Sequence, residues 1–148
     1  DKGEIPEGEY LIPIGKADVK RKGDHVTLVS FGKIIKVVHE AAEVLQKEGI
    51  SCEIIDLRSV RPIDYDTVVE SVKKTNRCVV IEESWPLASI SGEIAYHLQR
   101  YAFDYLDSPV IRVMQSDTPF AFSKVLIDEA LPNISRIVNA VKSSLYVS

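Results

Sequence analysis

The chain has 148 residues, which is enough for a single domain with a substantial hydrophobic core. Its 18 basic and 22 acidic residues give a formal charge of −4, whereas a surface that binds nucleic-acid phosphates normally shows a basic excess. No apolar run approaches the roughly 20 residues that span a membrane. The composition therefore argues against nucleic-acid and membrane partners and leaves a basic protein partner open.

Residues 1–16 show no sustained hydrophobic period and contain Pro6 and Pro13. We expect a linker here, with the folded domain at 17–148, so that the sequence is part of a longer chain. The two cysteines, Cys52 and Cys78, lie on apolar strand patterns. This placement is typical of buried, reduced thiols in an intracellular protein.

Strand and helix patterns alternate along the rest of the chain. Residues 17–20 and 26–31 flank the turn-forming sequence Lys22-Gly23-Asp24 and predict a β-hairpin. The other expected elements are a helix at 33–48, a strand at 53–55, a helix at 64–74, a strand at 78–81, a helix at 91–106, a strand at 110–114, a short helix at 123–130 and a last helix capped by Asn133. This order predicts a three-layer α/β/α domain with a mostly parallel sheet of about five strands, in which the first hairpin strand is antiparallel.

The segment 52–64 carries a high density of charge after its strand. Asp56, Arg58, Arg61 and Asp64 fall within nine positions, and Asp64 can also cap the following helix. In a parallel sheet this turn lies at the carboxyl edge, where sites and interfaces are usually built. Two interpretations stay open, proton-transfer chemistry or an ion network that shapes the edge and a subunit interface. The second is favoured.

A second polar group follows the next central strand. Glu82 and Glu83 close that strand and could act as an acid and base pair. Alternatively, one could cap the next segment while the other pairs with a neighbouring arginine. Trp85 lies in the following loop, where it either covers the sheet edge or anchors a protein contact. We expect all three side chains to belong to the same edge network or interface.

The sequence lacks the motifs of the common cofactor, metal and hydrolytic sites. The turn after residues 26–31 has one glycine, Gly32, which fits neither a dinucleotide-binding pattern nor a P-loop. The three histidines are scattered and lack the i, i+4 spacing of a helical zinc site. No G-x-S-x-G nucleophile elbow occurs. We therefore expect no catalytic, cofactor-binding or metal-binding residue within the sequence.

Several segments together resemble one family. The matching stretches are EYLIPIGKADV, VTLVSFGK, EAAEVLQKEGISCEIIDLRSVRPID, SVKKTNRCVVIEE, FDYLDSPVIRV and IDEALPNISRIVNAVK. They resemble the C-terminal domain of the transketolase superfamily and, within it, the β subunits of 2-oxoacid dehydrogenases. Residues 11–16 and Trp85-Pro86 favour the pyruvate branch. Residues 90–92 and 115–119 depart from the glycine-containing loops that are usual in the family.

The resemblance implies an enzyme that depends on thiamine diphosphate and magnesium, decarboxylates pyruvate and transfers the acetyl unit to a lipoyl group. It implies that residues 1–16 follow a pyrimidine-binding domain and that the cofactor lies outside this sequence. The implied partners are an α subunit and a second β subunit in a heterotetramer. The compartment stays open, because reduced cysteines fit the cytoplasm of a bacterium as well as the mitochondrial matrix of a eukaryote.

Four alternatives stay open beside the pyruvate enzyme. The chain could belong to a branched-chain 2-oxoacid or acetoin dehydrogenase, or to a transketolase-like enzyme. It could also be a freestanding anion-binding α/β module that uses Arg58 and Arg61.

The resemblance further implies two contacts with the subunit-binding domain of the dihydrolipoyl acyltransferase. The aspartate of the family's Leu-Asp-x-Pro segment is Asp107 here, and the C-terminal contact falls on Tyr146, Val147 and Ser148. That docking domain is basic, so an acidic receiving surface suits it. The other interpretation of Asp107 is a turn residue that ends the preceding helix.

Overall fold

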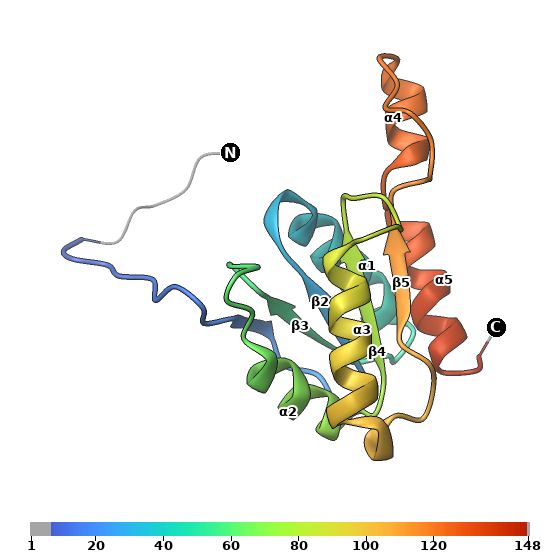
Figure 1. The fold of residues 1–148 in the computed structure, drawn as a ribbon. Coiled ribbons are helices and arrows are strands. Elements are labelled where there is room, and N and C mark those ends of the chain that lie inside the picture. The colour runs from blue at the N-terminus through green and yellow to red at the C-terminus, as the bar shows by residue number, and fades with distance from the viewer. Residues whose placement is uncertain (1–6, 148) are drawn as a thin grey trace.

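The computed structural model describes residues 7–147 of the chain. A five-stranded sheet lies between two layers of helices (Figure 1). The strands are β1 (Asp18–Arg21), β2 (Val26–Ser30), β3 (Cys52–Asp56), β4 (Cys78–Glu82) and β5 (Ile111–Met114). The helices are α1 (Ile35–Lys47), α2 (Tyr65–Thr75), α3 (Ile90–Tyr101), α4 (Lys124–Ala130) and α5 (Ile134–Ser144), with 3-10 turns η1 (Gly32–Ile34) and η2 (Phe103–Tyr105).

The strand order is β1-β3-β2-β4-β5, and β1 is the antiparallel strand. The predicted three-layer α/β fold with a mostly parallel sheet is therefore confirmed. The four parallel strands end at one edge of the sheet, the carboxyl edge, from which α4 projects (Figure 1). They begin at the opposite edge, the amino edge, where α2, α3 and α5 end.

The sheet separates two hydrophobic cores because both of its faces are covered. Leu28 and its neighbour Val29 on β2 illustrate this arrangement, since successive side chains of a strand point to opposite faces. Leu28 packs in the core formed with α1 and α5, and Val29 in the core formed with α2 and α3. Strands buried on both faces are continuous apolar runs, which is why the central strands show no polar alternation.

The predicted hairpin between residues 17–20 and 26–31 is wrong. β1 pairs with β3, and β2 lies on the other side of β3. The connection therefore crosses the start of β3 instead of turning back beside its own strand. Gly23 permits the crossing, because a Cβ at this position would lie 2.2 Å from the carbonyl carbon of Cys52. The glycine in the sequence thus marks a close approach of two backbones.

Polar caps set the ends of several helices, as the sequence indicates. Asp64 and Asn133 each accept a hydrogen bond from the backbone amide three residues further on, as N-cap residues do. The helix predicted at 91–106 is shorter than expected. α3 ends at Tyr101, because Ala102 leaves the helical conformation with φ −136°, and the separate turn η2 follows.

Candidate functional site

Three segments that are distant in the sequence meet at the amino edge of the sheet. They are the connection from α2 to β4, the turn between η2 and β5, and the end of α5. We call this group the amino-edge cluster, and its members are Asn76, Arg77, Asp107, Ser144 and Tyr146.

Asn76 joins the end of α2 to the turn that carries Asp107. It ends α2 in the left-handed conformation with φ 61°, which asparagine adopts more readily than most residues. Its carbonyl oxygen accepts from the Asp107 amide at 2.9 Å, and its side-chain amide donates to the Tyr105 carbonyl at 2.8 Å. Asn76 therefore holds the backbone of this turn at two points, the Tyr105 carbonyl and the Asp107 amide.

Arg77 bridges the Asp107 turn and the end of α5. Its Nη2 lies 3.1 Å from Asp107 Oδ2, and its Nε donates to the Ser144 carbonyl oxygen at 3.0 Å. The Asp107 side chain is 55% exposed, so the ion pair itself contributes less than about 1 kcal/mol. Within residues 7–147, Arg77 is the cation that pairs with this carboxylate. The main effect of the contact is to hold the exposed carboxylate in one orientation.

The structure brings two of the residues expected to bind the partner into contact. The Tyr146 hydroxyl donates to the Asp107 carbonyl oxygen at 3.3 Å. Tyr146 itself has φ 57°, and the turn after α5 is closed by the Val147 amide, which donates to the Lys142 carbonyl at 3.1 Å. The side chains of Tyr146 and Val147 are exposed. Ser148 lies outside the described residues.

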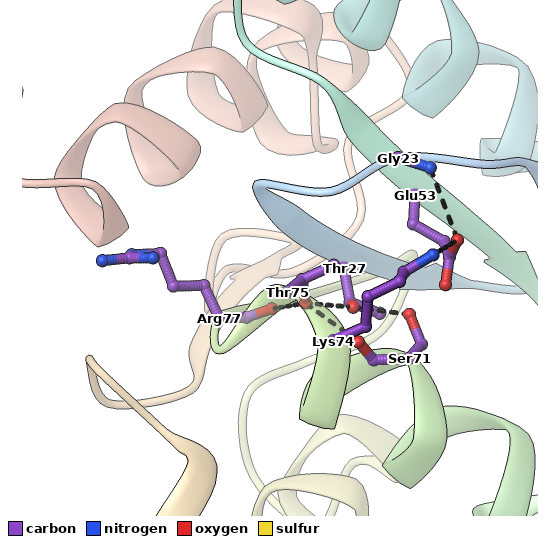
Figure 2. Close-up of polar contacts among 7 residues, drawn as sticks. All are labelled: Gly23, Thr27, Glu53, Ser71, Lys74, Thr75 and Arg77. Atoms are coloured by element: carbon purple, nitrogen blue, oxygen red, sulfur yellow. Dashed lines mark hydrogen bonds and ion pairs between the residues drawn. The ribbon is translucent and has the colours of Figure 1, made fainter.

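A buried hydroxyl network anchors the backbone of Arg77 to the sheet (Figure 2). The Arg77 carbonyl oxygen accepts from the Thr27 amide at 2.9 Å and from the Thr75 hydroxyl at 3.1 Å. The Thr27 hydroxyl lies 2.6 Å from the Ser71 hydroxyl and 2.7 Å from that of Thr75. Figure 2 shows the Arg77 side chain pointing away from this network. The main chain of Arg77 is thus anchored to the sheet, while its guanidinium group reaches the other members of the amino-edge cluster.

Glu53 on β3 lies beside this network and is buried although it is acidic. Its Oε2 accepts hydrogen bonds from Lys74 Nζ and, at 3.4 Å, from the Gly23 amide (Figure 2). Burial raises the pKa of Glu53, but hydrogen bonds led by those from Lys74 and Ser71 lower it by more, so the pKa lies below its usual value. Glu53 is therefore ionised and paired in the folded domain, where it ties β3 to α2.

At the carboxyl edge, part of the charged turn after β3 contacts β1. The Arg58 guanidinium donates to Asp18 of β1, and the Arg58 amide donates to Asp56 Oδ1 at 3.0 Å. Arg61 is exposed in the same turn. Because Arg58 already pairs with Asp18, the geometry lends no support to an anion site built from Arg58 and Arg61.

Asp64, the last residue of that turn, is buried and hydrogen-bonded. Its Oδ2 accepts from the Ala17 amide at 3.1 Å and from the Thr67 hydroxyl at 2.8 Å. Burial raises the pKa of Asp64, but the hydrogen bonds from Ala17 and Thr67 outweigh it and leave the pKa below its usual value. Asp64 therefore fixes the segment that leads into β1 as well as the start of α2.

Glu82 and Glu83 lie in different environments. Glu82 is buried and accepts from the Ser84 hydroxyl and, at 2.9 Å, from the Ser91 amide in the first turn of α3. A carboxylate suits this place, because a helix N-terminus carries partial positive charge. Glu83 is exposed and lines a groove of about 680 Å³ between the start of α1 and the junction of α4 and α5. The two carboxylates do not form an acid and base pair.

Trp85 is 53% exposed, and its indole Nε1 donates to the Thr118 carbonyl oxygen at 3.1 Å. It thereby fastens the loop after β4 to the loop after β5. The charged turns after β3 and after β4 are not neighbours at the carboxyl edge, because β2 lies between these two strands. Their residues therefore form two separate groups. The turn after β3 contacts β1 and α2, and the turn after β4 contacts α3 and the loop that follows β5.

The described residues meet neither the requirements of a metal site nor those of a membrane-spanning helix. Residues 7–147 contain no group of three or more His, Cys, Asp or Glu side chains that could hold a metal ion. None of the helices in this range is long and apolar enough to cross a membrane.

Sequence reasoning did not identify Asn76 or Arg77 as members of a site. Asn76 carries a usable signal, because asparagine after the last lysines of a helix is typical of a left-handed cap. Arg77 carries no such local signal. One of its partners, Ser144, is 67 positions away, and only the tertiary structure brings the two together.

The fold and these contacts define a three-layer α/β domain whose two polar edges hold distant segments of chain in place. Residues 15–137 match the family described as transketolase, C-terminal domain. The chain belongs to this family, as its sequence segments predict.

Two relatives that match most of the chain are described as pyruvate dehydrogenase E1 component subunit beta. The mitochondrial pyruvate dehydrogenase E1 component subunit beta of Dictyostelium discoideum is 48% identical over 134 residues, covering 90% of this chain and 38% of the relative. The pyruvate dehydrogenase E1 component subunit beta of Rickettsia felis is 45% identical over 145 residues, covering 98% of this chain and 44% of the relative. The chain therefore spans less than half the length of these curated relatives.

A solved structure titled "Split gene transketolase, inactive beta4 tetramer" has the same fold. Its TM-score is 0.81 at 27% sequence identity, and the match covers 98% of this chain and 46% of that chain.

Proposed function

We propose that this chain is the C-terminal assembly domain of the β subunit of a thiamine-diphosphate-dependent pyruvate dehydrogenase. The whole enzyme decarboxylates pyruvate oxidatively and transfers the acetyl unit to a lipoyl group. The observation that carries the proposal is the similarity of nearly the whole chain to pyruvate dehydrogenase E1 β subunits from Dictyostelium and Rickettsia. Residues 1–16 then link this domain to a preceding pyrimidine-binding domain, and residues 17–148 form the domain itself.

In this proposal, thiamine diphosphate and magnesium bind outside the chain. The described residues do not fit the metal, since they offer no cluster of three ligating side chains. The glycine-aspartate-glycine sequence expected for the diphosphate and magnesium is also absent from the sequence. The domain contributes to catalysis indirectly, by holding the subunits that form the active site.

The first role of the domain is subunit association. The α subunit and a second β subunit complete a heterotetramer, and the carboxyl edge supplies contacts through the turns that carry Arg61, Glu83 and Trp85. These three side chains are exposed, whereas Asp64 and Glu82 are buried and shape the turns from within. The similar split-gene transketolase is described as a β4 tetramer, which is consistent with a fold that works in assemblies.

The second role is docking of the basic subunit-binding domain of the dihydrolipoyl acyltransferase. We assign this role to the amino edge, where Asp107 and the residues Tyr146, Val147 and Ser148 form the receiving surface. The support is that the exposed Asp107 carboxylate belongs to a residue whose main-chain carbonyl oxygen accepts a hydrogen bond from the Tyr146 hydroxyl of the exposed C-terminal turn. An exposed carboxylate that is already held in place favours association with a basic partner.

The compartment follows from the source of the chain. We propose the cytoplasm for a bacterial protein and the mitochondrial matrix for a eukaryotic one. The relatives include both a mitochondrial protein and a bacterial one.

The test uses the full-length β subunit assembled with its α subunit. The complex should decarboxylate pyruvate only with thiamine diphosphate present, and it should prefer pyruvate over branched-chain 2-oxoacids and acetoin. A preference for either of the latter would move the chain to a neighbouring enzyme class.

Docking is measured separately with the purified subunit-binding domain. Asp107→Asn should weaken binding by about tenfold or more, because it removes one partner of a charged contact. The matched control is Asp117→Asn, which removes an exposed aspartate after β5 at the carboxyl edge. Equal affinities for both variants and the wild type would remove the amino edge from docking.

A further inference from the structure

We propose that Arg77 is a positioning residue for docking, which holds Asp107 and the C-terminal turn together as one pre-ordered surface. This inference rests on the proposed docking function of the amino edge. Arg77 is an unexpected residue to find there, because its positive charge opposes the approach of a basic partner. Its contribution must therefore come from geometry.

The guanidinium group of Arg77 connects the Asp107 side chain to the end of α5, beside the separate hydrogen bond from Tyr146 to the Asp107 main chain. Nη2 contacts the carboxylate of Asp107 at 3.1 Å, and Nε contacts the carbonyl of Ser144 at 3.0 Å. The planar guanidinium keeps these two donors in a fixed relation to each other, which a lysine ammonium cannot reproduce. Asp107 and the last turn of α5 are thus set at a defined distance.

The main chain of Arg77 is itself anchored, which supports the bridge that its side chain forms between Asp107 and Ser144. Its carbonyl oxygen accepts two hydrogen bonds from the buried residues Thr27 and Thr75 (Figure 2). The Arg77 side chain is 22% exposed, against 55% for Asp107. A partly buried, doubly anchored cation thus orients a more exposed carboxylate, whose second oxygen stays available to an incoming cation.

The charge of Arg77 and the bridge it forms affect different rate constants of binding. Loss of the Arg77 charge should leave the association rate unchanged or raise it, because a repulsion of the partner is removed. Loss of the bridge should speed dissociation, because the carboxylate and the turn must then be ordered when the partner binds. Ordering one exposed side chain and a turn corresponds to a change of about threefold to tenfold.

The experiment measures both rate constants by surface plasmon resonance, with the full α and β complex in solution and the subunit-binding domain immobilised. The variants are Arg77→Gln, Arg77→Lys, Asp107→Asn and the double variant. Arg112→Gln is the matched control, because it removes the same charge from an arginine that donates to the Pro86 carbonyl at 3.1 Å at the carboxyl edge. Thermal unfolding of each complex checks that the variants fold.

We expect Arg77→Gln to dissociate about threefold to tenfold faster without slower association, and Arg112→Gln to match the wild type. Arg77→Lys keeps the charge and can pair with Asp107 but cannot also hold Ser144, so its dissociation rate should lie between those of the wild type and Arg77→Gln. The double variant should dissociate no faster than Asp107→Asn alone, since the bridge acts through that carboxylate.

Three outcomes would overturn the inference. An unchanged dissociation rate for Arg77→Gln beside a faster one for Asp107→Asn would reject the positioning role while keeping the proposed docking function. A wild-type rate for Arg77→Lys would show that charge alone matters. Unchanged rates for both Arg77→Gln and Asp107→Asn would reject the docking function itself, and the inference with it.

Discussion

The Tyr146 hydroxyl and the main-chain carbonyl oxygen of Asp107 are hydrogen-bonded at 3.3 Å, across 39 positions of sequence. The family resemblance points to Asp107 and to the C-terminal residues as two separate contacts, and the structure makes them one surface. Because the bond uses the backbone of Asp107, a change of the Asp107 side chain leaves it intact. The two contacts can therefore be tested independently by substitution.

Tyr146→Gly should separate stability from docking. Tyrosine at φ 57° carries a steric cost that glycine does not, and the ring is 72% exposed. We expect the free energy of unfolding to rise by up to about 1 kcal/mol, while docking weakens because the ring and hydroxyl are lost. Urea denaturation and binding of the subunit-binding domain measure the two effects. Tyr146→Phe keeps the backbone conformation and should lose only about 0.5 kcal/mol of stability. A clear loss of stability in the glycine variant would contradict this account of the turn.

Gly23→Ala should destabilise the domain strongly, by about 3 kcal/mol or more. The added Cβ would meet the Cys52 carbonyl carbon at 2.2 Å and the Glu53 amide nitrogen at 2.4 Å, and backbone atoms cannot move aside easily. Chemical denaturation gives the loss directly. Gly92→Ala in α3 is the matched control, because its Cβ meets only ordinary contacts, beginning at 3.6 Å from Arg112 Nη1. That variant should be neutral or stabilising by up to about 1 kcal/mol. Similar losses at both positions would show that the crossing at Gly23 is not tight.

The Glu53 carboxylate should make stability depend on pH at the acid end. Its pKa is lower in the folded domain than the usual 4.5, so its contribution is complete above about pH 4.5. The contribution is lost as the pH falls through the lower folded value, where the carboxylate takes up a proton. Glu53→Gln should cost about 1–2 kcal/mol at pH 7, and the difference from the wild type should shrink below pH 4.5. Urea unfolding from pH 7 to pH 3 measures this difference.

Glu70→Gln is the control for the pH experiment. Glu70 pairs with Lys73 on the exposed face of α2, and its side chain is 71% exposed. Its removal should change stability by less than about 0.5 kcal/mol at every pH. A Glu53→Gln difference that stays constant down to pH 3 would mean that the carboxylate is not paired in the folded state.

The two cysteines should be unreactive while the domain is folded. Both are fully buried, and burial raises the pKa of each thiol to about 12. Labelling with iodoacetamide at pH 8 should be at least about a hundredfold slower in native protein than in denaturant, because it requires opening of the core. Ser143→Cys places a thiol on the exposed side of α5 and should label rapidly in the native protein. Fast labelling of native Cys52 or Cys78 would contradict the packing of the sheet.

Much of the fold could be predicted because the relevant signals are local. The apolar runs around Leu28 and Ile54 mark strands buried on both faces, and Asp64 and Asn133 mark helix starts. The hairpin prediction failed because turn chemistry at Gly23 reports only that the chain bends or approaches another backbone. It does not report which strand becomes the neighbour.

The candidate site was less accessible to sequence reasoning for a related reason. Asp107 and Tyr146 were found through the family resemblance, since neither has a distinctive local pattern. Arg77 was missed because both ends of its bridge are long-range contacts. Glu82 and Glu83 are adjacent in sequence, but Glu82 is the last residue of β4 and is buried against the start of α3, whereas Glu83 lies beyond the strand and is exposed.

The antiparallel direction of β1 determines at which edge of the sheet the chain enters the domain. β1 enters beside the end of β3, with Asp18 opposite Asp56, whereas α5 runs back and finishes at the start of β4 beside Arg77. The polypeptide therefore enters at one pole of the domain and leaves at the other. Any domain joined ahead of β1 is therefore attached at the carboxyl edge, opposite the edge where α5 ends.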